Sequence, residues 1–185
     1  MGLMLHSLNE LPQDAERSYY IYLLDYGWHE PLGDVIMQNF MKISEKASKN
    51  KAVFIKGIDS SHVDNEILSW HHVNGEDGEK ILPAIMITNM NPHKFKVLDD
   101  KGIIENKDKI ILIPLKNYCK NTTDVINLIQ KIFEDIEEKK ELTDFKVKNI
   151  MKKGIGKKLL DGVILQPNFI GVGFDLKAFL NKKET

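Results

Sequence analysis

The fold is decided by the stretch Tyr19-Tyr20-Ile21-Tyr22-Leu23-Leu24-Asp25, which is followed closely by Trp28-His29-Glu30-Pro31-Leu32. Nearly every residue of the first run is apolar or aromatic, which predicts a β-strand that is covered on both faces. From Gly33 to Asn50, apolar residues recur at the spacing of one helix face. The run 52–58 predicts a second strand. A strand, a helix and a strand in this order form a βαβ unit, in which the two strands are parallel.

Four further elements are predicted along the chain. A helix begins near Ser60-Ser61, which offers an N-cap. The apolar runs 81–88 and 109–115 predict a third and a fourth strand, and 123–139 is a helix with a clear apolar face. This order predicts an α/β fold with a mixed sheet of about four strands and flanking helices.

The composition indicates one globular domain with an appendage and no strong overall charge. The 185 residues carry 26 basic and 27 acidic side chains, a net charge of −1, so the whole chain attracts neither nucleic acid nor a membrane surface. Cys119 is the single cysteine, which excludes an intrachain disulfide. The first residues lack the basic flank and apolar core of a signal peptide, and no apolar run approaches the length of a bilayer span. We therefore expect a cytoplasmic protein.

The sequence predicts three parts. Residues 1–17 are expected to form an N-terminal arm, residues 18–140 the domain, and residues 141–185 a basic linker followed by an apolar C-terminal extension. Burying each Leu, Ile or Phe of that extension gains about 1.5–3 kcal/mol, so it must pack on the domain, a second copy, another protein or a membrane surface. We expect a protein partner or self-association through this extension.

Three local matches make the chain resemble the thioredoxin-like superfamily over residues 18–137. The stretch Trp28–Leu32 aligns with the family's Trp-Cys-Gly-Pro-Cys turn, so that Pro31 falls on the motif's proline. Gly57-Ile58-Asp59 ends the second strand as an Asn/Val-x-Asp does in many thioredoxins. Leu82-Pro83 at the start of the third strand is similar to the family's cis-proline. The resemblance implies a thioredoxin-like fold with the C-terminal extension added.

The chain departs from thioredoxins where their chemistry lies. His29 occupies the position of the attacking cysteine and Leu32 that of the resolving cysteine. Neither imidazole nor isobutyl can replace the thiolate that attacks a disulfide. The sequence therefore predicts a redox protein's scaffold without thiol–disulfide exchange, and we expect no cofactor.

The resemblance also implies a mode of binding that needs no thiol. In the family, the cis-proline lies opposite the first turn of the helix that begins near Pro31, and the backbone before it pairs with an extended peptide. In the alternative interpretation, Pro83 begins an edge strand in trans. We expect a non-catalytic thioredoxin-fold module for protein binding or assembly. Its predicted binding residues are Trp28, His29, Pro31, Leu82 and Pro83.

A rival hypothesis is an enzyme that reuses the same turn. His29 would be the general base, with Glu30 or Asp25 assisting it, which requires the three side chains to lie within hydrogen-bond reach. The simpler interpretation is a polar turn in which Glu30 complements the helix dipole.

A second alternative uses the lysines between residues 146 and 158 to bind anionic lipid or nucleic acid. Aromatic residues that could stack on bases are almost absent there, which disfavours nucleic acid. A solvated linker is the default, and a membrane surface stays open as the less favoured alternative. The string 167–176 is similar to the tails of small bacterial proteins, some from phage-defence systems. This similarity suggests a bacterial defence or toxin-linked assembly.

Two remaining residue groups carry no predicted chemistry. His62, His71 and His72 lie near several acids, but their spacing matches no strong metal motif. We expect exposed helix ends there and no metal. Cys119 lies far along the chain from the turn and has no second cysteine, so we expect a structural thiol.

Overall fold

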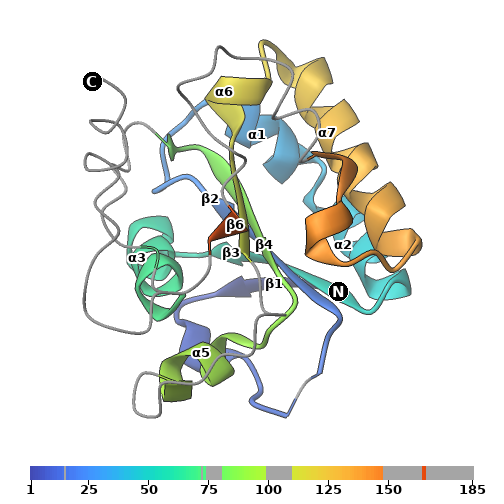
Figure 1. Cartoon of the computed structure of the whole chain (residues 1–185). Coiled ribbons are helices and arrows are strands. Elements are labelled where there is room, and N and C mark those ends of the chain that lie inside the picture. The colour runs from blue at the N-terminus through green and yellow to red at the C-terminus, as the bar shows by residue number, and fades with distance from the viewer. Residues whose placement is uncertain (15, 72, 74–80, 99–109, 148–163, 166–185) are drawn as a thin grey trace, which may run out of the picture.

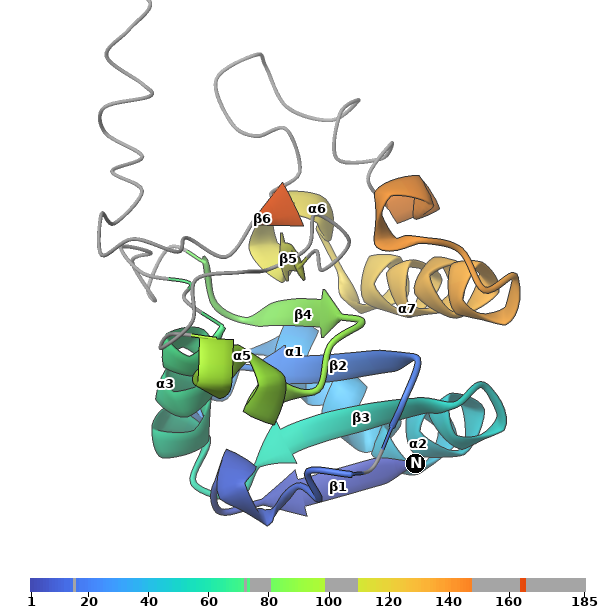
Figure 2. The same ribbon diagram turned by 60° about the horizontal axis from the view of Figure 1, so that its bottom comes forward.

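The protein is built on one mixed β-sheet. Its computed structural model describes residues 1–14, 16–71, 73, 81–98, 110–147 and 164–165. The strand order is β1-β3-β2-β4-β5-β6, which Figure 2 shows from β1 at the bottom to β6 at the top. The strands are β1 (Gly2–Leu5), β2 (Tyr19–Leu24), β3 (Ala52–Gly57), β4 (Ala84–Thr88), β5 (Ile110–Pro114) and β6 (Ile164–Leu165). β1, β3 and β2 are parallel, whereas β4 is antiparallel to both β2 and β5.

Helices cover both faces of this sheet. The described helices are α1 (Pro31–Gln38), α2 (Phe40–Lys49), α3 (Ser60–Trp70), α5 (Pro92–Leu98), α6 (Leu115–Tyr118) and α7 (Thr122–Glu137), with short 3-10 turns η1 (Leu8–Glu10) and η2 (Leu142–Asp144). α1, α2 and α7 lie on one face, and α3 and α5 lie on the other (Figure 1). None of the helices in the described ranges has the length and apolarity that a membrane crossing requires.

The central strand β2 contributes to the core on both faces of the sheet. All six of its side chains are buried. The odd-numbered ones pack in the core beneath α1, α2 and α7, and the even-numbered ones pack in the core beneath α3 and α5. This division follows from the two-residue period of a strand. The prediction of a strand covered on both faces is confirmed.

The α/β class and the parallel β2–β3 pair are confirmed, but the sheet has six strands rather than about four. One additional strand comes from the expected arm: Gly2–Leu5 pairs with Phe54–Gly57 at the sheet edge. The prediction that residues 1–17 form only an arm is therefore wrong. The other addition is β6, which pairs with β5 over two residues.

Two helix boundaries differ from the prediction. The helix expected over 33–50 is divided at Asn39, whose side-chain amide donates to the Val35 carbonyl at 2.8 Å. Such a local side-chain bond competes with the helical pattern. The N-cap of α3 is Asp59 rather than Ser60, because the Asp59 carboxylate accepts from the His62 backbone N–H at 3.2 Å.

The C-terminal extension begins inside the core and not with a linker. Leu142, Phe145 and Val147 are buried in the core beneath α1, α2 and α7. Lys146 contacts the acidic end of α7, with Nζ 3.1 Å from a Glu134 carboxylate oxygen. The boundary predicted at residue 141 is therefore too early. Most of the predicted linker and extension lies outside the described residues.

Candidate functional site

The turn that follows β2 lies beside the turn that follows β3. Because these strands are parallel, with Leu23 opposite Lys56, both chains leave the sheet at the same edge. Trp28 is 40% exposed on the first turn and Ile58 is 50% exposed on the second. Large apolar side chains at such exposure mark surfaces that contact other molecules when they gather in one place. We call Trp28, His29, Pro31 and Ile58 the turn surface, since all four are exposed.

A buried ionic pair lies beneath the turn surface. Lys56 Nζ donates to Asp25 Oδ2 and also to Ser60 Oγ, the latter at 3.0 Å. The other Asp25 oxygen accepts from the Gly27 backbone N–H at 2.8 Å. All three polar residues of this group are buried. A buried charge needs a partner, so the pair joins the end of β2 to the end of β3.

Asp64 on α3 holds the same turn from a second direction. Its Oδ2 accepts from the backbone N–H groups of Asp25 and Tyr26, each at 2.8 Å. The side chain is fully buried, and burial raises the pKa of Asp64 to about 7, against the lowering effect of these hydrogen bonds. With Asp25, three successive backbone N–H groups of the turn are thus bound by carboxylates.

These hydrogen bonds fix an unusual backbone conformation. Tyr26 has φ 50° and Gly27 has φ 77°, and the left-handed region is unfavourable for a residue with a Cβ. The Tyr26 ring packs edge-on against Trp28 with 5.7 Å between centroids, and its hydroxyl donates to Asn65 Oδ1 at 2.9 Å. The position of Trp28 is therefore set by the buried carboxylates through Tyr26.

Pro83 lies at the base of this site. The peptide bond between Leu82 and Pro83 is cis. An ideal Cβ built on Gly33, in the first turn of α1, would lie 3.5 Å from Pro83 Cβ and 4.0 Å from Asp25 Cβ. Leu82 and Pro83 are buried. The structure thus brings the predicted binding residues to one region, but only Trp28, His29 and Pro31 expose their side chains.

The three predicted catalytic residues do not form one constellation. The His29 side chain is 98% exposed, and its ring nitrogen lies 4.0 Å from Asp34. Asp25 is buried with Lys56, and Glu30 lies 2.8 Å from Lys116. General base catalysis needs a positioned base with its orienting partner, which His29 does not have among these residues.

The expectation of exposed histidines at the end of α3 is wrong for His71. This side chain is fully buried, with Nδ1 2.7 Å from the Ile67 carbonyl oxygen and the ring 4.5 Å from that of Phe95. Its polar atoms are used inside the core. His72 lies outside the described residues, within which no group of three or more His, Cys, Asp or Glu side chains could hold a metal ion.

The sequence did not indicate a role in this site for Ile58, Lys56 or Asp64. Lys56 interrupts an otherwise apolar strand, and such a lysine needs a buried acid as partner. Its partner, Asp25, directly follows β2 and is distant from Lys56 in the sequence, so the sequence did not identify the pair. Asp64 lies near the start of α3, where an exposed acid is common, so the sequence pattern alone does not show that it is buried.

Comparison of the chain with protein-family models, with curated proteins and with solved structures finds no match.

Proposed function

We propose that this chain is a thioredoxin-like protein-binding module without thiol chemistry, and that the turn surface is where its partner docks. One observation carries the proposal: Trp28 and Ile58 are both exposed, on the turns that follow the neighbouring strands β2 and β3, and a buried network fixes the turn that carries Trp28. A preorganised apolar anchor loses little conformational freedom when it binds.

The thioredoxin-like assignment is supported by the surroundings of Pro83. The helix after β2 begins at Pro31, as the resemblance implies, and Gly33 in its first turn faces Pro83, where an added Cβ would lie 3.5 Å from Pro83 Cβ. β4, which Pro83 precedes, pairs antiparallel with β2, and Ala84 lies opposite Leu24. This arrangement puts the turn and the start of β4 at one edge of the sheet.

The absence of thiol exchange is supported by the surroundings of Cys119. This cysteine is buried after α6, and burial raises its pKa to about 11. A thiol of that pKa is protonated at neutral pH, and the thiolate is the reactive form. Below the turn, both Asp25 oxygens, Asp64 Oδ2 and Lys56 Nζ are hydrogen-bonded within the protein, while Asp64 Oδ1 is buried without a hydrogen-bond partner in the described part of the chain.

The experiment is affinity capture from a bacterial host with the wild-type chain, with Trp28→Ala and with Ile126→Ala. Ile126 on α7 is the matched control because it is 39% exposed, nearly the same as Trp28. We expect a partner that is retained by Ile126→Ala and lost by Trp28→Ala. Equal capture by both variants would contradict the docking surface. Reduction of insulin disulfides by the purified protein would contradict the redox-inactive module.

Self-association through the C-terminal extension remains part of the proposal. β6 shows that one segment of the extension returns to the sheet and pairs with β5. Sedimentation velocity of the full chain at several concentrations measures the oligomeric state directly. The bacterial defence or toxin-linked setting remains a prediction from the tail.

A further inference from the structure

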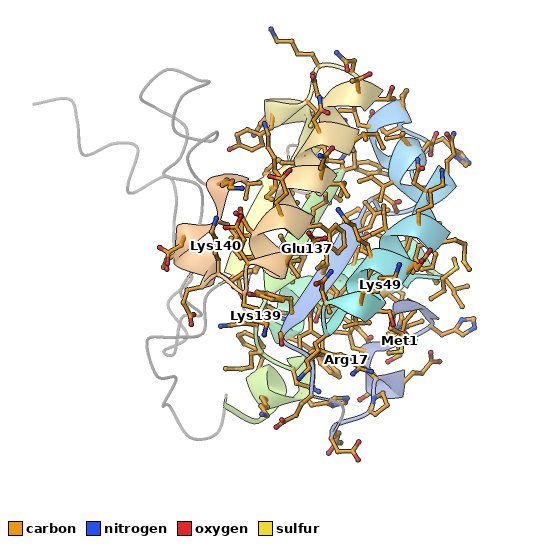
Figure 3. All side chains as sticks on the ribbon, turned by 90° about the vertical axis from the view of Figure 1, so that its right-hand side faces the viewer. Met1, Arg17, Lys49, Glu137, Lys139 and Lys140 are labelled. Atoms are coloured by element: carbon orange, nitrogen blue, oxygen red, sulfur yellow. The ribbon has the colours of Figure 1, made fainter. Side chains whose placement is uncertain are left out.

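A second candidate site lies at the opposite ends of β2 and β3 from the turn surface. A cavity of about 440 Å³ opens there, between the end of α2, the start of β2 and the segment that follows α7. Four lysines, Lys49, Lys51, Lys139 and Lys140, line it with one acid, Glu141. Figure 3 faces this side of the molecule. Lysines from two helix ends thus line one cavity, and nearby cations stabilise a bound anion.

The four lysines differ in whether an acid of the described residues pairs with them. Lys140 Nζ lies 2.8 Å from Asp135 and 2.6 Å from Glu138, so its charge is used within the protein. Lys49 pairs with Glu45 at 2.7 Å. Within the described part of the chain, neither Lys51 nor Lys139 forms an ion pair.

The same two lysines have a backbone conformation that disfavours any side chain. Lys51 has φ 51° and Lys139 has φ 53°. Each directly follows the C-cap residue of its helix, Asn50 for α2 and Glu138 for α7. This is the position where helices commonly place glycine. The α7 end has the full hydrogen-bond pattern, since Lys139 N–H donates to Ile136 O and Lys140 N–H to Asp135 O.

A helix end alone does not explain a lysine at both positions, because glycine would serve each better. Non-glycine residues in this conformation cluster at binding sites. A further cation, Arg17, precedes the cavity-lining Ser18, and its buried Nε has no hydrogen-bond partner within the described chain. Arg17 lies on the same face as Lys49 and Lys139 (Figure 3).

The size and walls of the cavity indicate more than a free inorganic ion. The volume lies within the range of small-molecule sites. Ile136 and Leu142 border the cavity from the core, and each is buried. We propose that this cavity binds a phosphorylated small molecule of about mononucleotide size, with its phosphate held by Lys51 and Lys139. A single phosphate group would accept hydrogen bonds from both lysines.

The test is calorimetric titration of the full chain at low ionic strength with adenosine monophosphate, adenosine and inorganic phosphate. We expect adenosine monophosphate to bind at least about tenfold more tightly than either of the others. Lys51→Gly and Lys139→Gly should each weaken that binding by about tenfold, without lowering the melting temperature, because glycine suits both positions. This combination separates a ligand role from a structural one.

Lys131→Gln is the charge control, since it removes an exposed lysine from α7. Its binding should equal that of the wild-type chain. Equal weakening by Lys131→Gln would overturn the proposal, because binding would then follow general surface charge. Absence of binding, or adenosine monophosphate binding no more tightly than inorganic phosphate, would also overturn it.

Discussion

Replacing Asp64 by Asn should change how stability depends on pH. In the folded protein, burial raises the pKa of this carboxyl from 3.8 to about 7. Between these values the unfolded chain has released the proton while the folded chain keeps it, so stability falls as pH rises through this window. Above about pH 7 both states are ionised, and the loss is complete.

The size of the effect follows from the two pKa values. A rise from 3.8 to about 7 is about three units, and at about 1.4 kcal/mol per unit the ionised carboxylate costs the folded state about 4 kcal/mol. Asn cannot ionise, and its amide oxygen can still accept from the backbone N–H groups of Asp25 and Tyr26. The variant should therefore resemble protonated Asp64 at every pH.

Urea denaturation of both proteins at intervals from about pH 5 to about pH 8 measures this difference. We expect Asp64→Asn to gain about 3 kcal/mol of stability relative to the wild-type chain across that interval, because about two of the three units lie within it. The comparison between the two proteins removes the contribution of the other titrating groups. Stability curves that stay parallel over the whole interval would refute a raised Asp64 pKa.

Three further predictions concern the core of the site and the thiol. Gly33→Ala should stabilise the fold by up to about 1 kcal/mol, because the added Cβ fits against Pro83 at an ordinary contact distance. Gly27→Ala should destabilise the fold by about 1 kcal/mol, because Gly27 has φ 77°. Urea midpoints of the two variants that shift in the same direction would contradict this pair of predictions. Lys56→Met leaves buried Asp25 without its cation and should cost about 3–5 kcal/mol, most of which adding Asp25→Asn should restore in a double-mutant cycle. Cys119 should resist Ellman's reagent in the native protein and react in concentrated urea, since burial raises its pKa to about 11; rapid reaction of the native protein at neutral pH would show an accessible thiolate.

Much of the fold could be predicted because it follows from the spacing of apolar residues along short segments of the chain. The continuous apolar run of β2 and the one-sided pattern of α7 each determine their own element. β1 could not be predicted in the same way. Gly2–Leu5 is a four-residue strand with no β-branched residue, and its strand conformation depends on pairing with β3, which is distant in the sequence.

The exposed residues Trp28 and Pro31 of the candidate site could be predicted from the sequence, whereas the buried residues that fix the turn could not. The sequence pattern indicated these two residues because a turn between a strand and a helix can be recognised from a short stretch of sequence. The Asp25–Lys56 pair and the Asp64 hydrogen bonds join residues from three different elements. The role of these acids depends on their burial. The same acid on an exposed first turn of a helix would only interact favourably with the helix dipole.

The central claim is that Trp28 contacts another protein, and site-specific photo-crosslinking in the native host tests it most directly. A photoreactive phenylalanine analogue replaces Trp28 in one strain and the equally exposed Ile126 in a second. The account predicts a discrete protein adduct from position 28 and none from position 126. No adduct from position 28, or the same adducts from both positions, would contradict it.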